Sequence, residues 1–290
     1  MRARGAAGTA LAVFYIVLWA SAYVPSKVGA TAAPALWFLV ARFLTAGLVM
    51  AVIAIALQRS FPRRGLDWLI YAGLGVLANA AYLGLTYLAL GRGLSAGIGS
   101  IVASTNPLVV ALVAPSLLHE PLTRLKFLGL ALGFGGVVGV VLARGGGTSA
   151  RPEDVALAFL GVCANVGSTI VFKRARAGTD LLAINTIQLL AAGLAVIPAA
   201  LLLEGAPVVQ LTPALIASFA YLVAVLSVGA SLLWFWLLSR RDASRVSAFY
   251  FLTPVFGLLF GALFLSETVG PSDLFGLVAI ALGILLVQRG

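Results

Sequence analysis

Ten long, nearly uninterrupted apolar runs constrain this chain more than any other feature of its sequence. A helix that crosses the ~30 Å hydrocarbon layer of a membrane needs roughly 20 mostly apolar residues. The chain has runs of about this length at residues 8–29, 34–57, 66–90, 94–118, 124–143, 153–173, 180–203, 212–238, 244–265 and 273–288. The runs are continuous and do not alternate apolar with polar residues, so they predict helices and argue against a transmembrane β-barrel.

The composition agrees with lipid as the solvent of this chain. Hydrophobic residues make up 62% of the sequence and charged residues only 10%, with a mean hydropathy of +1.10. Soluble domains carry roughly 25% charged residues, so this chain has too few charges to cover a surface in contact with water. The predicted fold class is an all-α integral membrane protein with ten transmembrane helices. The first run also resembles a signal peptide, because two arginines precede it and Ala20-Ser21-Ala22 resembles a cleavage site. It has a counterpart in the second half of the chain, however, so we expect it to be a span.

The positively charged residues predict the orientation in the membrane. If the N-terminus lies in the cytoplasm, the outside segments hold only Arg92, Arg144 and Arg151. The cytoplasmic segments then hold Arg2, Arg4, Arg59, Arg63, Arg64, Arg124, Lys126, Lys173, Arg174, Arg176, Arg240, Arg241, Arg245 and Arg289. We therefore expect a multi-pass protein of the plasma (inner) membrane with both termini in the cytoplasm. Topology also explains the net charge of +10, so no nucleic acid partner is expected.

Several classes of site are excluded by residue counts. The single cysteine, Cys163, forms no internal disulfide or cysteine cluster, and the single histidine, His119, builds no multi-histidine site. No HExxH motif, paired aspartates or Ser–His arrangement is present. We therefore expect no cofactor, no metal and no enzymatic activity.

The two halves of the chain resemble each other. At a constant separation of 147 residues, identical residues recur as Ser100 and Ser247, Pro107 and Pro254, Glu120 and Glu267, Gly129 and Gly276, and Gly136 and Gly283. Nearer the start of each half the separation is 146, which aligns Lys27 with Lys173, Arg42 with Gln188, and Gly47 with Gly193. The sequence predicts two five-helix repeats, 1–146 and 147–290. Because five is odd, the second repeat enters the membrane from the opposite side, an arrangement found in secondary transporters.

These motifs resemble those of the drug/metabolite transporter superfamily, in its form with two tandem EamA-type repeats. The resemblance rests on Trp19 followed by small residues, on Arg42, and on a proline, glutamate and glycine pattern that occurs twice: Pro107, Glu120, Gly129 and Pro254, Glu267, Gly276. It covers nearly the whole chain. Within the superfamily the sequence looks most like exporters of aromatic and other amino acids, and this resemblance implies a small-molecule substrate.

Polar and aromatic residues inside the spans mark a candidate site, since such groups are costly in lipid unless they face a cavity or a partner. They follow helical stripes on the first, third, fourth, sixth, eighth and ninth spans. The predicted substrate-binding residues are Trp19, Asn79, Tyr82, Ser100, Asn106, Asn165, Trp234 and Tyr250. Amides and aromatic rings together suit a zwitterion with an apolar side group. The alternative is that these polar residues hydrogen-bond the helices to one another.

Two prolines and two glycine-rich spans have predicted mechanical roles. Pro107 and Pro254 lie inside their runs at symmetric positions, where each would remove a backbone hydrogen bond and act as a hinge or a static kink. The fifth and tenth spans are glycine-rich and contain no polar side chain between residues 127–143 and 274–287. We expect them at the periphery, where Gly129 and Gly133 could support a homodimer.

Two charged residues at span ends and one inside a span leave alternatives open. Glu120 and Glu267 are predicted to cap the N-terminus of the following helix, or to serve as a gate or proton site. Arg42 lies about a third of the way into its span. Its guanidinium could pair with a carbonyl, attract a substrate carboxylate or extend to the membrane surface.

The functional prediction is a secondary transporter. It would export small, aromatic or hydrophobic amino acids and related metabolites by alternating access around a central cavity. No acidic residue lies near mid-membrane, so we expect transport driven by the substrate gradient without a proton-binding carboxylate. The alternatives are an exporter of other small solutes, such as drugs or sugars, and a channel.

Overall fold

The computed structural model describes residues 2–92, 94, 102–143, 151–175, 179–253, 255–256, 259–260 and 271–290. The elements of the first part of the chain are α1 (Arg2–Ser21), α2 (Tyr23–Ala32), α3 (Ala35–Ala56), α4 (Gly65–Gly75), the π-helix η1 (Val76–Ala81), α5 (Tyr82–Gly91), α7 (Asn106–Leu118) and α8 (Arg124–Ala143). The second part contains α9 (Pro152–Arg174), α10 (Leu181–Glu204), α11 (Pro213–Tyr221), the π-helix η2 (Leu222–Ala230), α12 (Ser231–Arg240), α13 (Ala243–Ser247), the 3-10 helix η3 (Ala248–Leu252) and α15 (Pro271–Arg289).

These elements group into the ten predicted spans, which confirms the predicted fold class. The composite spans are α1 with α2, α4–η1–α5, α11–η2–α12, and α13 with η3. Among the described residues, five helices are long and apolar enough to cross a membrane: Ala35–Ala56, Gly65–Ala89, Pro152–Arg174, Leu181–Glu204 and Pro213–Arg240. The predicted boundaries hold within a few residues for most spans, and α8 covers the same residues as the fifth apolar run.

Helix ends follow the local chemistry of the sequence. Asp180 caps α10 by accepting a hydrogen bond from the Leu182 N–H at 2.8 Å, and Thr212 caps α11 through the Leu215 N–H. His119 ends α7 in the left-handed conformation, with φ of 57°. The single histidine therefore lies at a helix end, outside the predicted substrate path.

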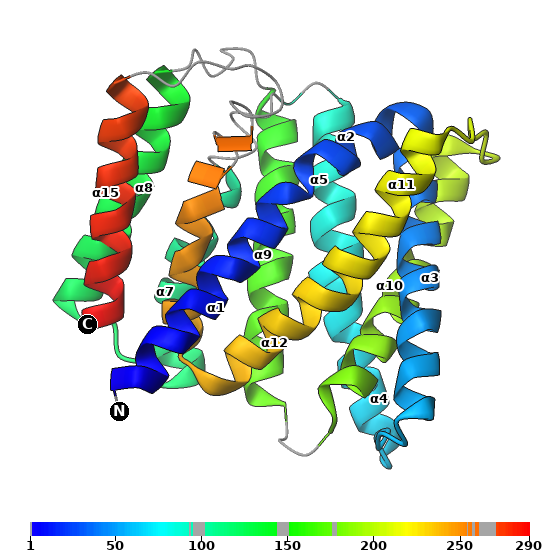
Figure 1. Ribbon diagram of the computed structural model, residues 1–290, viewed down its shortest axis with the longest axis horizontal. Coiled ribbons are helices and arrows are strands. Elements are labelled where there is room, and N and C mark those ends of the chain that lie inside the picture. The colour runs from blue at the N-terminus through cyan, green and yellow to red at the C-terminus, as the bar shows by residue number, and fades with distance from the viewer. Residues whose placement is uncertain are drawn as a thin grey trace.

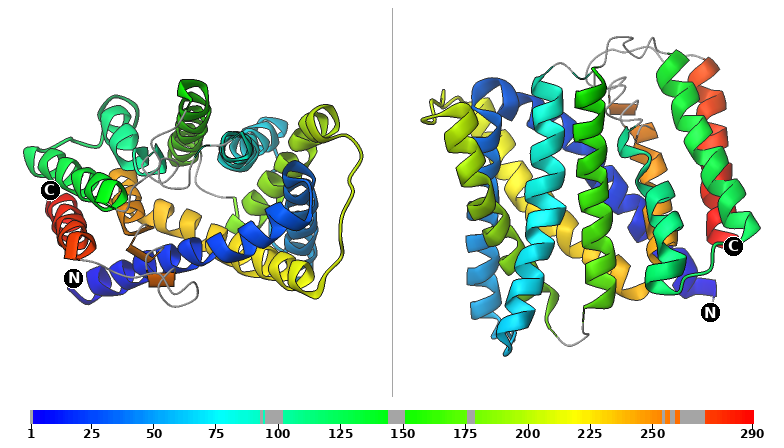
Figure 2. Two further views of the ribbon diagram at one scale, coloured as in Figure 1. Left: turned by 90° about the horizontal axis from the view of Figure 1, so that it is seen from above. Right: turned by 180° about the vertical axis from the view of Figure 1, so that it is seen from behind.

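The spans form an elongated bundle in which two helix pairs lie at opposite ends. α8 and α15 lie side by side at one end and α3 with α10 at the other, while α1 crosses the front of the bundle diagonally (Figure 1). The view from behind shows the same two pairs at opposite ends with left and right exchanged, and both termini lie near one edge (Figure 2). The expected peripheral position of the fifth and tenth spans agrees with this arrangement.

Glycines let α8 and α15 approach each other closely. A Cβ atom on Gly129 would lie 2.6 Å from the carbonyl oxygen of Gly283, and a Cβ on Gly136 would lie 2.9 Å from that of Gly276. The repeat aligns Gly129 with Gly276 and Gly136 with Gly283. Exchanging the two halves therefore maps one close contact onto the other.

The pair α3 and α10 has the same reciprocity. A Cβ on Gly47 would lie 2.7 Å from Leu190 Cδ2, and a Cβ on Gly193 would lie 2.7 Å from Leu44 Cδ2. Both pairs thus behave as self-complementary contacts, as expected for two units related by a two-fold axis. This agrees with a 5+5 repeat of inverted topology. The exact boundary between residues 146 and 147 lies outside the described residues and stays a prediction.

The two π-helices occupy equivalent positions in the third and eighth spans. η1 begins at Val76 and η2 at Leu222, which are 146 residues apart. Each packs against the second helix of the other repeat, η1 against α10 and η2 against α3. π-helical segments are rare and occur frequently at functional sites.

The position of Pro107 differs from the prediction. It is the second residue of α7, where a missing N–H removes no intrahelical hydrogen bond, and a turn at Ser104 and Thr105 precedes it. The expected place inside a continuous helix is therefore wrong, because this turn interrupts the span and relieves the clash that proline would make. Pro254 lies outside the described residues, so the paired hinge stays a prediction.

Candidate functional site

Four aromatic side chains from the first, eighth and ninth spans form one cluster. The Tyr15 ring of α1 stacks on Trp234 of α12, with centroids 5.1 Å apart and planes at 27°. Tyr250 of η3 meets Trp234 edge to face at 5.2 Å and Trp19 of α1 at 6.2 Å. The Tyr15 and Tyr250 hydroxyls share a hydrogen bond of 2.9 Å. The cluster joins side chains from both repeats.

Burial gives this aromatic cluster an apolar character. Tyr15, Trp234 and Tyr250 are buried and Trp19 is half-buried. Tyr82, the first residue of α5, is half-buried. In the bond between the two tyrosines one hydroxyl donates and the other accepts. The aromatic rings around it offer an apolar or aromatic group favourable contacts.

A pair of asparagines joins the fourth and sixth spans. Asn106 Nδ2 of α7 donates a hydrogen bond of 2.9 Å to Asn165 Oδ1 of α9, and both side chains are buried. Asn106 Oδ1 has no hydrogen-bond partner among the described residues. A buried amide oxygen without a partner favours a polar ligand or a water molecule at this point.

The structure therefore brings together part of the predicted set. Trp19, Trp234 and Tyr250 share the aromatic cluster, and Asn106 contacts Asn165. Asn79 lies half-buried on η1, which packs against α9 and α10. Ser100 lies outside the described residues. The predicted substrate-binding role of all eight residues stays a prediction.

The predicted substrate-binding set left out Tyr15, although the sequence places it on the same polar stripe of the first span as Trp19. It lies four residues before Trp19 and so on the same face of α1. That spacing was the available signal, but a buried tyrosine on a membrane helix does not by itself indicate that residues 235 positions apart in the chain contact each other.

Arg42 has a partner that none of the three alternatives included. Its Nε donates a hydrogen bond of 2.9 Å to the hydroxyl of Ser227 in η2, and the side chain is only 6% exposed. Asn185 of α10 donates to the Ser227 carbonyl oxygen at 3.2 Å and to Ser231 Oγ at 2.7 Å. A second buried polar group thus lies where η2 meets α3 and α10.

Glu120 also has a different partner from the predicted one. Its carboxylate accepts hydrogen bonds from the Ala243 N–H at 2.8 Å, the Ser244 N–H at 3.2 Å and the Ser244 hydroxyl at 2.9 Å. Glu120 therefore caps α13 of the other repeat and not α8, because the fold places the end of α7 beside the start of α13. Glu267 lies outside the described residues.

Two further contacts join helix ends on the face of the bundle where Glu120 lies. Lys173 Nζ donates to the Arg241 carbonyl oxygen, and Arg174 Nε donates to the Leu117 carbonyl oxygen at 2.8 Å. At the opposite end, Glu204 of α10 accepts from the N–H groups of Leu36 and Trp37 at 3.0–3.1 Å. Carboxylates thus cap helices of the other repeat at both ends of the molecule.

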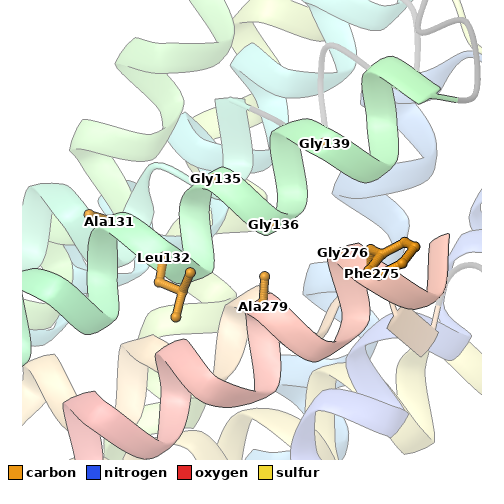
Figure 3. Close-up of a pocket in the computed structure, with 8 residues that line it drawn as sticks. All are labelled: Ala131, Leu132, Gly135, Gly136, Gly139, Phe275, Gly276 and Ala279. Carbon is orange, nitrogen blue, oxygen red and sulfur yellow. The ribbon is translucent and has the colours of Figure 1, made fainter. Parts of the chain in front are cut away.

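A groove of about 480 Å³ lies between α8 and α15 (Figure 3). Its lining consists of glycines and apolar side chains: Ala131, Leu132, Gly135, Gly136, Gly139, Phe275, Gly276 and Ala279. A polar solute would find no side-chain partner there. Gly129 and Gly133 pack inside the chain, against α15 and Phe251, and the homodimer through these spans stays a prediction.

Comparison with known proteins adds to this geometry. The model of the EamA-like transporter family matches the chain twice, at residues 6–142 and 154–289. The uncharacterized transporter YvbV of Bacillus subtilis is 27% identical over 279 residues, covering 96% of this chain and 90% of that protein. Protein PecM of Dickeya dadantii is 30% identical over 250 residues, covering 84% and 82% of the two chains.

Two more similarities extend over almost the whole chain. A probable amino-acid metabolite efflux pump of Salmonella typhimurium is 26% identical over 286 residues, covering 94% of this chain and 92% of that one. A crystal structure with 20% sequence identity superposes with a TM-score of 0.81 and covers 98% of both chains, which shows the fold. The double family match, together with the ten-span fold that it accompanies, establishes that this chain is a transporter of the EamA-like transporter family.

Proposed function

We propose that this protein is a secondary transporter that exports aromatic, hydrophobic or small amino acids and related metabolites across the plasma membrane. The observation that supports it most directly is the cluster of Tyr15, Trp19, Trp234 and Tyr250, which three spans from both repeats build together. Aromatic faces of this kind bind apolar and aromatic side groups. The similarity to a probable amino-acid metabolite efflux pump agrees with this substrate class.

The proposed mechanism is alternating access. Two similar halves in opposite orientations can exchange conformations, which opens a central site first to one side of the membrane and then to the other. The aromatic cluster and the Asn106–Asn165 pair both join helices that would move relative to each other in this exchange. The turn before Pro107 offers a place where α7 can change direction.

Electrostatics support a mechanism without an obligatory proton. The acidic residues of the described helices lie at helix ends, where Asp180, Glu204 and Glu120 serve as caps. A proton-coupled carrier usually has a carboxylate inside the transport path. The concentration gradient of the exported solute is therefore the proposed driving force.

Counterflow in proteoliposomes tests the proposal. Vesicles containing the purified protein are loaded with unlabelled phenylalanine, threonine, glucose or buffer, and uptake of each labelled solute is followed without an ion gradient. We expect labelled phenylalanine to accumulate transiently when phenylalanine is inside, because a carrier exchanges solute on both sides. Vesicles with no protein provide the control.

The remaining outcomes distinguish the alternatives. Counterflow with glucose alone would replace the amino-acid assignment by a sugar carrier. Uptake that does not saturate and shows no counterflow would indicate a channel. No uptake of any of the solutes would contradict the amino-acid proposal and leave the family and the fold unchanged.

A further inference from the structure

The polar residues around Ser227 are buried in the membrane-spanning region but lie outside the aromatic cluster. Arg42, Asn185 and Ser227 are 6%, 1% and 4% exposed. Arg42 binds the Ser227 hydroxyl from α3, and Asn185 binds the Ser227 carbonyl oxygen from α10. Two helices that belong to different repeats thus hold the same residue of η2. Ser227 lies in a π-helix, a geometry that occurs frequently at functional sites.

The guanidinium of Arg42 is a buried positive charge whose partner is neutral. Arg42 lies seven residues after the first residue of α3, about 10 Å along the helix. Within the described part of the chain no carboxylate forms an ion pair with it. A buried charge without a counter-ion is costly, and the Ser227 hydroxyl together with the Phe43 ring, whose centroid lies 5.8 Å from Arg42 Cζ, compensates only part of that cost. An anionic group beside Arg42 would remove the remainder.

The repeat shows that the packing does not require this charge. The residue equivalent to Arg42 in the second half is Gln188, on the matching helix of the matching pair. Gln188 is fully buried, its backbone lies against Gly75 at the end of α4, and its side-chain nitrogen and oxygen have no partner among the described residues. Its helix, α10, packs against η1, the counterpart of η2. A neutral amide therefore fits the same structural position. The positive charge exists in one half only, which favours a role in ligand recognition over a role in helix packing.

A hydrogen-bond acceptor lies on the other side of Ser227. Asn185 uses its Nδ2 for Ser227 and Ser231, but its Oδ1 is buried and has no partner among the described residues. An amide oxygen accepts hydrogen bonds from an ammonium group. The same residue of η2 is thus flanked by a donor with positive charge and by an unpartnered acceptor.

The eighth span connects this polar group with the aromatic cluster. Ser227, Ser231 and Trp234 follow one another at helical spacing along η2 and α12. Trp234 stacks on Tyr15 of the cluster. A ligand with a charged head and an apolar side group would find the two parts of its binding site along one helix.

We propose that Arg42 and Asn185 form a subsite for the carboxylate and the ammonium group of an α-amino acid, with the aromatic cluster receiving the side chain. This subsite rests on the proposed function. The guanidinium donates to the carboxylate in place of the Ser227 hydroxyl, and the ammonium donates to Asn185 Oδ1. The residues are closed over each other in this structure, so the ligand enters in another conformation of the transport cycle.

Three related ligands test the two halves of the subsite on the purified protein in detergent. Phenylalanine carries both groups, phenethylamine lacks the carboxylate, and 3-phenylpropionate lacks the amine. Binding is measured as the ligand-dependent rise in unfolding temperature, which yields an apparent Kd. For the wild-type protein we expect phenylalanine to bind roughly tenfold or more tightly than either analogue, because each analogue lacks one charge-assisted interaction.

The variants assign that preference to individual residues. Arg42→Gln introduces the residue type that the second repeat has at the equivalent position, Gln188. It should lower phenylalanine affinity to that of phenethylamine and leave phenethylamine affinity unchanged. Asn185→Leu should lower the affinity for phenylalanine to the affinity for 3-phenylpropionate. Thr186→Val is the matched control, because Thr186 is a buried polar residue of the same helix whose hydroxyl donates to the Leu182 carbonyl oxygen of α10 itself. It should leave all three affinities in their wild-type order.

Each outcome decides between the subsite and the function on which it rests. If Arg42→Gln keeps the wild-type preference for phenylalanine over phenethylamine, the subsite is wrong and the amino-acid function stands. If wild-type protein binds none of the three ligands and shows no counterflow with any amino acid, the proposed function fails. Should Arg42→Gln not fold, equal wild-type affinities for phenylalanine and phenethylamine would still overturn the subsite.

Discussion

At the scale of single residues, the interior of this protein is organised by polar side chains that find partners on other helices. Asn106 and Asn165 pair across the fourth and sixth spans, and Arg42 contacts Ser227 across the second and eighth. In lipid such contacts matter because an unpaired polar group has no water to bind. Each contact therefore fixes the mutual position of two spans as well as marking a polar point along the candidate path.

The asparagine pair gives a prediction at this scale. Asn106→Ala removes the donor to Asn165 Oδ1, which leaves a buried acceptor unpaired at a cost of about 1–3 kcal/mol. We expect lower transport activity and a lower unfolding temperature. Asn106→Ala, Asn165→Ala and the double variant form a cycle, measured by transport and by thermal unfolding. The loss of stability in the double variant should be smaller than the sum of the losses in the two single variants, because the two side chains contact each other.

Ser116 offers a control on the same helix. Among the described residues, its hydroxyl donates to the Val113 carbonyl oxygen of α7 itself and to no other helix. Ser116→Ala should therefore keep wild-type transport and stability. Additive effects of the two asparagine substitutions would show that the pair is not energetically coupled.

At the scale of elements, glycine positions decide which helices can approach each other. Gly129 and Gly136 contact the backbone of α15, and Gly47 and Gly193 contact leucines across the α3–α10 pair. These two pairs form the ends of the bundle, whereas the helices that carry the aromatic cluster lie between them (Figure 1). The tight pairs are suited to act as rigid supports for the moving helices.

Glycine-to-alanine substitutions test this packing with one chemical change at two sites. At Gly283 an added methyl group would lie 2.6 Å from the Gly129 carbonyl oxygen and from the Gly133 nitrogen, both backbone atoms. Gly283→Ala should therefore lower the stability by about 1–3 kcal/mol, as overpacking does. Nothing lies within 4 Å of the corresponding position at Gly135, so Gly135→Ala should be neutral. Thermal unfolding in detergent measures both, and equal unfolding temperatures would contradict the close packing.

At the scale of the whole molecule, two carboxylates connect the repeats at the opposite faces of the bundle, where the spans begin and end. Glu204 caps α3 within the closely packed α3–α10 pair. Glu120 follows α7, the helix of the fourth span that begins at Asn106. It caps α13, the helix of the ninth span that leads into Tyr250. If the fourth and ninth spans separate when the site opens at this end, the Glu120 contact must break in each transport cycle.

The prediction for the whole molecule concerns that contact. Glu120→Gln replaces an acceptor oxygen by a donor, so it weakens the bonds to Ala243 and Ser244. We expect the fourth and ninth spans to separate more often on the face where Glu120 contacts α13. The reporter is Ser247→Cys, a buried position on α13, in a Cys163→Ser background. A water-soluble maleimide should label it roughly tenfold faster, since about 1.4 kcal/mol changes an opening equilibrium tenfold.

Glu204→Gln is the matched control for this experiment. It weakens a cap of the same chemistry at the opposite face of the bundle, on the closely packed α3–α10 pair. Labelling at residue 247 should keep the wild-type rate in this variant. Equal labelling rates for Glu120→Gln and the wild type would mean that the Glu120 contact does not hold this end closed.

The amino-acid sequence by itself determined the solvent, the number of spans, the repeat and the family of this protein. These properties depend on helix length, hydropathy and spacing along the chain, which are local or periodic quantities. The same reasoning identified Trp19, Trp234 and Tyr250 as candidate residues, because polar and aromatic groups in apolar runs are conspicuous one by one.

Only the tertiary structure decided which of these residues contact each other. The partner of Glu120 lies 123 residues away, and the partner of Arg42 lies 185 residues away. Neither periodicity nor hydropathy contains that information, because a helix face indicates a direction and not the neighbour in that direction. The turn before Pro107 and the two π-helices were likewise invisible in the sequence. Local backbone geometry in a membrane helix depends on the neighbouring helices that can satisfy its freed backbone groups.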